Sequence, residues 1–443
     1  MAVENQFDLF KKRRFAPLFC TQFLGAFNDN LYKNALIILL AFTTQTTSLN
    51  QHTLINLCAA LFIIPYFLFS AFAGQLADKY EKSKLIQIIK IVEILLAILI
   101  TLGFVFNNLL LLLGSLFLLG TQATFFGPLK YSILPQHLEE SELVGGNGLI
   151  EMGTFIAILL GTIAGGLLIA IPNMGPIWVS INICIVALLG WAISTLIPKA
   201  EPYTKNLKLD WNPLRQTIQV LKASTQNRTV FHAIIGISWF WLYGSNFLTQ
   251  IANYTKITLG GNEHVATLLL TTFSIGIGLG SILCEKLSHK KVELGLVLLG
   301  SLGLTLFAID LSLAHSPLPH AESSELGAAE FIQYGQNWRI LFDSLMMGAF
   351  GGFYLVPLYT LIQQKSEPEQ RSRMIAANNI LNALFMTVAS ILAIFLLNLG
   401  LSIPQFFLVT ALLNAAFAVY LCVVAPEFFT RFITFVFRRK HTE

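Results

Sequence analysis

Long runs of predominantly apolar residues recur along the chain, and they constrain its fold more than any other feature. The segments 54–73 and 85–106 are two examples. A helix needs about 20 apolar residues to cross a bilayer, whereas a barrel strand needs about 10 with strict alternation. Charged residues make up 12% of the 443 residues, and a soluble domain carries about twice that share. The runs therefore predict an all-α membrane protein and exclude a soluble or disordered chain.

Twelve spanning helices are predicted from these runs and from the Pro, Gly and Asn residues that separate them. The polar segment 198–228, in which 209–222 has the spacing of an amphipathic helix, divides the spans into two sets of six. The expected spans are 15–43, 53–77, 85–106, 109–134, 145–171, 176–197, 229–256, 263–287, 292–314, 335–364, 374–398 and 403–425. The expected parts are a tail at 1–14, bundles at 15–197 and 229–425, a central loop at 198–228 and a basic tail at 426–443.

The basic residues indicate how these spans are oriented. When the 28 Lys and Arg are sorted by loop, with Lys90 counted in the loop after the second span, all but Lys33, Lys256 and Arg339 lie on one side. The positive-inside rule then predicts a multi-pass membrane protein with both termini in the cytoplasm. The bases are spread over short loops and form no single basic face, so we expect no nucleic-acid partner.

An internal repeat supports the division into pseudo-symmetric halves. An acid followed by a base ends the second span and recurs at the end of the eighth, and a Pro-Leu pair in the fourth span recurs in the tenth. A stretch rich in small residues and Asn opens the fifth and eleventh spans. The matched residues are Asp78-Lys79 with Glu285-Lys286, Pro128-Leu129 with Pro357-Leu358, and 145–151 with 376–382.

The residues 74–79, which read GQLADK, resemble the loop signature of the major facilitator superfamily. The chain departs from this signature at Glu81, where Gly is usual, and at Ser83, where a base is usual. The resemblance implies a fold of two six-helix halves about a central cavity. Four further motifs are similar to the lysophospholipid transporter branch of that superfamily. They are QFLGAFNDN at 22–30, GPLKYSIL at 127–134, NGLIE at 147–151 and GGFYLVPL at 351–358.

This branch implies a flippase that moves lysophosphatidylethanolamine-type lipids to the cytoplasmic leaflet of the inner membrane for re-acylation. Some relatives carry the acyltransferase as a C-terminal fusion. Here the chain ends soon after the twelfth span, so we expect a separate acyltransferase or acyl-ACP synthetase as partner, besides the lysophospholipid substrate and the membrane lipids. The alternative on the same scaffold is a proton-coupled exporter or importer of drugs or siderophores, with Asp29 or Glu151 as the titrating group.

Charged and amide side chains inside the spans are the candidates for substrate binding, because such residues are costly in a bilayer unless they face a cavity or a partner. Asp29 and Lys33 lie one helical turn apart, where they could neutralise each other or complement a zwitterionic headgroup. Lys130 follows Gly127-Pro128, which predicts a helix break, although a lysine at a helix end can also snorkel. The candidates are Asn28, Asp29, Asn30, Lys33, Lys130, Asn147, Glu151, Asn378 and Asn382.

Interhelical hydrogen bonding is the competing interpretation for the last four of these residues. Arg339 and Asp343 repeat the spacing of one helical turn and predict a second internal pair. Charge pairs at helix ends are instead candidates for gating, with a solvated charge run as the alternative. They are Asp78, Lys79, Glu285 and Lys286. We expect no enzyme activity, cofactor or metal site, since the five cysteines and eight histidines form no clustered motif.

Overall fold

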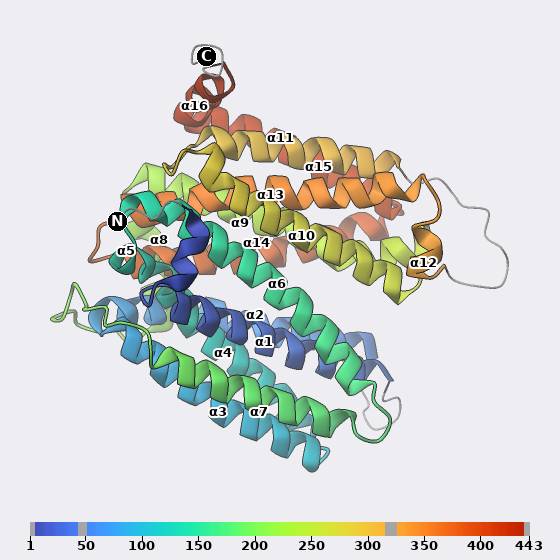
Figure 1. Cartoon of the computed structure of the whole chain (residues 1–443), viewed down its shortest axis with the longest axis horizontal. Helices are drawn as coiled ribbons and strands as arrows, with labels where there is room; N and C mark the ends of the chain where they lie inside the picture. The colour runs from blue at the N-terminus through green and yellow to red at the C-terminus, as the bar shows by residue number, and fades with distance from the viewer. Residues whose placement is uncertain (1–4, 43–50, 315–325, 438–443) are drawn as a thin grey trace. The chain divides into compact units, whose positions relative to one another are not determined.

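A computed structural model of the chain describes residues 5–42, 51–314 and 326–437, and the main elements in these ranges are helices (Figure 1). The long helices are α1 (Ala16–Phe42), α2 (Gln51–Lys79), α3 (Lys82–Val105), α4 (Leu109–Ser132), α6 (Leu143–Ile169), α7 (Gly175–Ser194), α9 (Arg228–Asn253), α10 (Glu263–Leu287), α11 (Gly295–Leu313), α13 (Asn337–Lys365), α14 (Arg371–Asn398) and α15 (Ile403–Val424). The short helices are α5 (Leu134–His137), α8 (Pro213–Ser224), α12 (Ala328–Phe331) and α16 (Pro426–Phe437).

Each long helix occupies one of the twelve expected spans, so the predicted fold class is correct. In the described part of the chain, ten helices are long and apolar enough to cross a membrane. The other two long helices, α1 and α9, have 27 and 26 residues, and at 1.5 Å per residue each extends about 40 Å. They have the length for a span but are more polar. In α1 the polarity comes from the stretch 28–34, which contains the first candidate residues.

The helices form two compact units whose segments alternate along the sequence. Unit 1 comprises 1–146, 156–231 and 362–383, and unit 2 comprises 147–155, 232–361 and 384–443. Residues 147–155 in the first half of α6 therefore belong to unit 2, and the first half of α14 belongs to unit 1. The bundle boundaries expected from the sequence stay a prediction.

Unit 1 is built around α1, which packs on α2, α4 and α7, while α3 packs on α4 and α7. Its apolar core includes the fully buried Leu31, Ala35 and Leu116, and the Tyr32 hydroxyl donates to the carbonyl oxygen of Leu112 at 2.7 Å. Glycines bring α6 against α1, because a Cβ at Gly161 would collide with a backbone oxygen of α1. This close packing fixes the position of the polar stretch 28–34 of α1 relative to α6.

In unit 2, glycines likewise bring the backbones of α10 and α13 close together. A Cβ at Gly276 or Gly280 would collide with backbone oxygens of α13, and one at Gly348 would collide with a backbone oxygen of α10. The small residues that the sequence places in both regions thus let the helix backbones approach closely. In the same unit α11 packs along α15, and α16 contacts both (Figure 1).

Two details of the expected organisation are wrong. Lys90, counted with a loop, lies eight residues inside α3 and is 1% exposed. The expected break at Gly127-Pro128 is absent, because α4 continues through Pro128 to Ser132. Proline removes one hydrogen bond from a helix without always ending it, and here it lies within the last turns. The amphipathic helix expected within 209–222 is α8, with its N-cap at Asn212.

Candidate functional site

Amide side chains in the middle of α1 tie this helix to its neighbours. Asn28 is 4% exposed, and its Nδ2 donates to Glu93 Oε1 at 3.1 Å and to the carbonyl oxygen of Ile183 in α7 at 3.3 Å. Asn34 Nδ2 donates to the carbonyl oxygen of Thr162 in α6 at 2.7 Å. Asn30 instead bonds one turn back, to the carbonyl oxygen of Ala26 at 2.8 Å. These bonds hold α1 in one rotation, and so they decide where Asp29 points.

Asp29 and Lys33 do not neutralise each other in this structure. In the described part of the chain, no ion pair within 4.0 Å joins them, and the Lys33 ammonium lies 5.1 Å from the centre of the Phe62 ring. Asp29 Oδ1 is buried and has no hydrogen-bond partner among the described residues. Buried polar atoms in native proteins are nearly always paired, so an unfilled acceptor needs an explanation. A donor on a bound ligand is one such explanation.

A buried ionic network beside Asn28 was missed by the sequence analysis. Lys90 Nζ lies 2.6 Å from Glu93 Oε2, and both side chains are 1% exposed. Gln122 Nε2 of α4 donates to the same oxygen at 3.1 Å. Gly25 of α1 makes room, since a Cβ there would lie 2.6 Å from Lys90 Nζ. The sequence does carry a signal for this network, because Lys90 and Glu93 are opposite charges one helical turn apart in an apolar span.

Lys130 lies near the end of the continuous α4. It is 9% exposed, and its ammonium lies 4.8 Å from the centre of the Tyr131 ring. The glycine three residues earlier, Gly127, faces α14 within unit 1, where a Cβ would lie 2.6 Å from Asn379 Nδ2. The Gly-Pro-Leu-Lys motif therefore combines close helix packing with a buried cation.

The two polar pairs expected on matching faces of α6 and α14 belong to different units. Asn147 and Glu151 lie in unit 2, are 0% and 1% exposed, and Asn147 Nδ2 donates to Thr360 Oγ1 of α13 at 3.2 Å. Asn378 and Asn382 lie in unit 1. Asn378 is fully buried, and its side-chain amide has no hydrogen-bond partner among the described residues. Like Asp29 Oδ1, it is one of several buried polar groups of unit 1 without a hydrogen-bond partner among the described residues.

The gating candidates differ in their contacts. Asp78 is 2% exposed and accepts from Arg373 Nε at 2.9 Å and from the backbone N–H of Ser372 at 3.0 Å, so it joins the end of α2 to the start of α14 within unit 1. Lys79 lies with its ammonium 5.6 Å from the Tyr80 ring centre. Near the end of α10, Glu285 is buried and Lys286 is exposed.

Glu81, where the chain departs from the family signature, caps α3. Its carboxylate accepts from the backbone N–H of Ser83 at 2.9 Å, of Lys84 at 2.9 Å and of Ala200 at 2.8 Å. Burial acts to raise the pKa of Glu81, but these hydrogen bonds outweigh it and leave the pKa below its usual value. The carboxylate therefore fastens the chain after α7 to the start of α3, a task that the usual glycine lacks the side chain to perform.

The expected pair of Arg339 and Asp343 is wrong. Arg339 Nε instead lies 3.0 Å from Asp310 Oδ2 of α11, and no ion pair joins Arg339 to Asp343 in the described part of the chain. Asp343 is fully buried within unit 2. Arg339 therefore links α13 to α11. The spacing of residues within one helix cannot reveal a partner on another helix.

The comparisons with known proteins identify the chain as a transporter rather than an enzyme. The profile of the major facilitator superfamily matches residues 18–321 and 258–435. The chain belongs to this superfamily and is a multi-pass membrane protein.

Two curated relatives are lysophospholipid transporters. The chain is 28% identical over 351 residues to "Lysophospholipid transporter LplT" of Escherichia fergusonii, covering 78% of this chain and 79% of the relative. It is also 28% identical over 353 residues to the same transporter of Escherichia coli O157:H7, with the same coverage. These matches agree with the resemblance carried by the sequence motifs.

Solved structures of low identity share the fold. The transporter FucP in its outward conformation aligns with a TM-score of 0.69 at 15% identity, covering 93% of this chain and 98% of FucP. The human organic anion transporter MFSD10 aligns with a TM-score of 0.68 at 13% identity, covering 96% of this chain and 99% of MFSD10. At such identities the likeness concerns the fold alone.

Proposed function

We propose that the chain is a lysophospholipid flippase, which moves lysophosphatidylethanolamine-type lipids to the cytoplasmic leaflet of the inner membrane by alternating access. The observation that carries this proposal is the buried Asp29 Oδ1 without a partner, set in the amide-rich stretch of α1. Such an atom accepts a hydrogen bond from the ammonium of a phosphoethanolamine headgroup. Similarity to the lysophospholipid transporters of the two Escherichia relatives supports this choice of ligand.

A zwitterionic headgroup also needs a cation for its phosphate. Lys33 and Lys130 are the candidates, since both belong to unit 1 together with Asp29. Lys33 is free of an ion pair within the described residues and rests against an aromatic ring. Point charges of lysine suit a phosphate without demanding a fixed geometry. The amides of Asn28, Asn30, Asn378 and Asn382 complete the proposed polar groups of unit 1. In unit 2, Asn147 and Glu151 stay proposed substrate-binding residues.

Uptake of labelled lysophosphatidylethanolamine into proteoliposomes tests the proposal. Charged hydrogen bonds contribute about 1.5–3 kcal/mol, so Asp29→Asn should lower the apparent affinity by about tenfold or more. The matched control is Asp210→Asn, which removes a carboxylate before α8 and should leave uptake unchanged. Uptake by Asp29→Asn equal to that of the unsubstituted chain would contradict the role of Asp29.

The same assay separates the flippase from a proton-coupled exporter or importer of drugs or siderophores. Lysolipid uptake that persists without a proton gradient favours the flippase. Absence of lysolipid movement, together with gradient-driven efflux of another solute, favours the alternative, in which Asp29 or Glu151 carries the proton. A separate acyltransferase or acyl-ACP synthetase that receives the lipid in the cytoplasmic leaflet stays a prediction.

For gating we propose the helix-end charges Asp78, Lys79, Glu285 and Lys286. The ion pair of Asp78 with Arg373 supports this for the first of them, because it closes the end of α2 against α14 within unit 1. A pair at a helix end can separate at low cost once water reaches it.

A further inference from the structure

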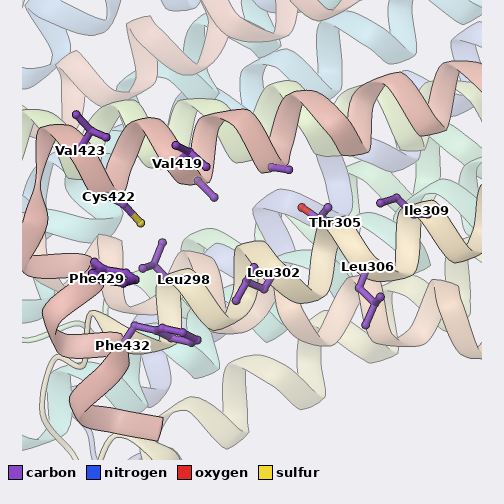
Figure 2. A pocket seen from close by; sticks show the side chains of 12 residues that line it. Leu298, Leu302, Thr305, Leu306, Ile309, Val419, Cys422, Val423, Phe429 and Phe432 are labelled. Atoms are coloured by element: carbon purple, nitrogen blue, oxygen red, sulfur yellow. The ribbon is translucent and has the colours of Figure 1, made fainter.

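An apolar groove of about 640 Å³ lies in unit 2 on the outer face of α11 and α15 (Figure 2). Figure 2 shows Leu302 and Leu306 on α11, Val419 and Val423 on α15, and Phe429 and Phe432 on α16, which crosses one end of the groove. Leu306 is 62% exposed and Val423 is 72% exposed. Both helices are long and apolar enough to cross a membrane, so in a membrane protein this exposed surface meets the hydrocarbon of the bilayer.

The groove offers no polar partner to water. Thr305 carries the only hydroxyl among its lining side chains, and that hydroxyl donates to the carbonyl oxygen of Ser301 at 3.0 Å and accepts from Asn414 Nδ2 at 3.0 Å. A cavity holds water only where it can supply two or more polar partners. Hydrocarbon is therefore the matching occupant. Along α11 the lining extends from Leu298 to Ile309, a rise of about 16 Å.

At the closed end of the groove, α16 packs tightly against the start of α11. Gly295, at the start of α11, lets α16 approach so closely that a Cβ there would lie 2.9 Å from the Cβ of Phe435 and 3.0 Å from the carbonyl oxygen of Arg431. Phe428 at the start of α16 is fully buried. Other aromatic residues of α16 stay exposed, among them Phe437 at 65%, as in helices that lie in a membrane interface.

A basic side chain lies at this end of the groove. Arg431 is exposed on α16, and the sequence continues into Arg438-Arg439-Lys440 beyond the described residues. Basic residues beside spanning helices attract anionic lipids. We propose that the groove binds one acyl chain of an anionic membrane phospholipid whose headgroup lies at α16 beside Arg431. This lipid is a resident ligand, distinct from any transported lysolipid, and the inference needs only the membrane location of the chain.

Native mass spectrometry of the full chain in mild detergent tests this inference, with added phosphatidylglycerol or phosphatidylcholine as the probe. Attraction by one surface arginine corresponds to about a fivefold preference for the anionic lipid. Arg431→Gln should reduce this preference by about that factor, whereas Lys222→Gln on α8, an exposed lysine of unit 1, should preserve it. Equal binding of the two lipids by the unsubstituted chain would overturn the proposal.

Filling the groove gives the second arm. Ala415→Trp places an indole in the groove and should abolish phosphatidylglycerol binding, while Ala416→Trp, on the exposed side of the same helix and outside the lining, should retain it. Should Ala415→Trp fail to fold, Val419→Trp at a 63% exposed lining position replaces it.

Three further results would overturn the proposal. The first is unchanged lipid binding by the groove variants. The second is that these variants lose the mass of a dimer and not the mass of a bound lipid, which would assign the groove to contact with a second copy of the chain. The third is displacement of phosphatidylglycerol by lysophosphatidylethanolamine, which would place the groove on the transport path. Lysolipid uptake is measured separately, so failure of the proposed flippase activity leaves these outcomes distinct.

Discussion

Asp29 is positioned by a hydrogen-bond network of which it is not itself a member. Asn28, the preceding residue, is held by Glu93, and Glu93 is in turn bound by Lys90 and Gln122. A buried charge pair with further hydrogen bonds is stable only while all its members are present. The carboxylate of Asp29 is therefore positioned by a network that involves three helices of unit 1.

Replacing one member of the Lys90–Glu93 pair should destabilise the protein more than replacing both members by apolar residues. Glu93→Leu leaves the Lys90 ammonium buried without its partner, which costs about 3–5 kcal/mol, whereas a pair of apolar residues in place of both charges is often neutral. We expect a much lower Tm for Glu93→Leu and for Lys90→Met. The double variant should lose less than the sum of the two single losses, although the amides of Asn28 and Gln122 then lack their acceptor. A double variant with the summed loss of both single variants would contradict an interacting pair.

Asp78 should control access to the start of α14. Asp78→Asn keeps the shape of the side chain but removes the charge that holds Arg373, and charged hydrogen bonds are worth about 1.5–3 kcal/mol. In a chain without its native cysteines, Ser372→Cys should then react with a maleimide about tenfold faster. Lys84→Gln is the control, because Lys84 is an exposed lysine in the first turn of α3 and is not among the proposed gating residues. A labelling rate unaffected by Asp78→Asn would exclude the gating role.

At the scale of elements, the helices were predictable and their partners were not. Apolar runs specify spans because a bilayer demands about 20 such residues, and the observed α3 and α10 end within one residue of the expected limits. The polar residues of α1 were likewise visible as candidates. Their contacts depend on the rotation and packing of neighbouring helices, so neither the link from Asn28 to Glu93 nor the pair of Arg339 with Asp310 could be derived from spacing.

The contact of α6 with α1 gives a prediction at this scale. Gly161→Leu places a side chain where the backbone of α1 lies, and overpacking of this kind costs about 1–3 kcal/mol. We expect a lower Tm and reduced lysolipid uptake, because α1 carries Asp29. Gly114→Leu in α4 is the matched control, since no atom lies within 4 Å of the added Cβ. Equal effects of the two substitutions would show that the helix contact is unimportant.

At the scale of the whole molecule, the polar helices α1 and α9 decide how many times the chain crosses the membrane. Each is long enough, but neither is among the ten helices whose composition alone supports a span. Their polar groups are partly satisfied inside the protein, as when Trp239 Nε1 of α9 donates to Asn414 Oδ1 of α15 at 2.9 Å. Internal hydrogen bonds of this kind lower the cost of placing a polar helix in a bilayer.

Residues on either side of α9 test whether it spans. The exposed Gln226 precedes this helix, and Glu263, whose side chain is 80% exposed, follows it at the start of α10. In a chain without its native cysteines, Glu263→Cys should react with a membrane-impermeant maleimide in intact cells, and Gln226→Cys only after permeabilisation. Labelling of both on one side would mean that α9 does not cross. The number of spans would then be odd, the termini would lie on opposite sides, and the sorting of basic residues that places both termini in the cytoplasm would fail.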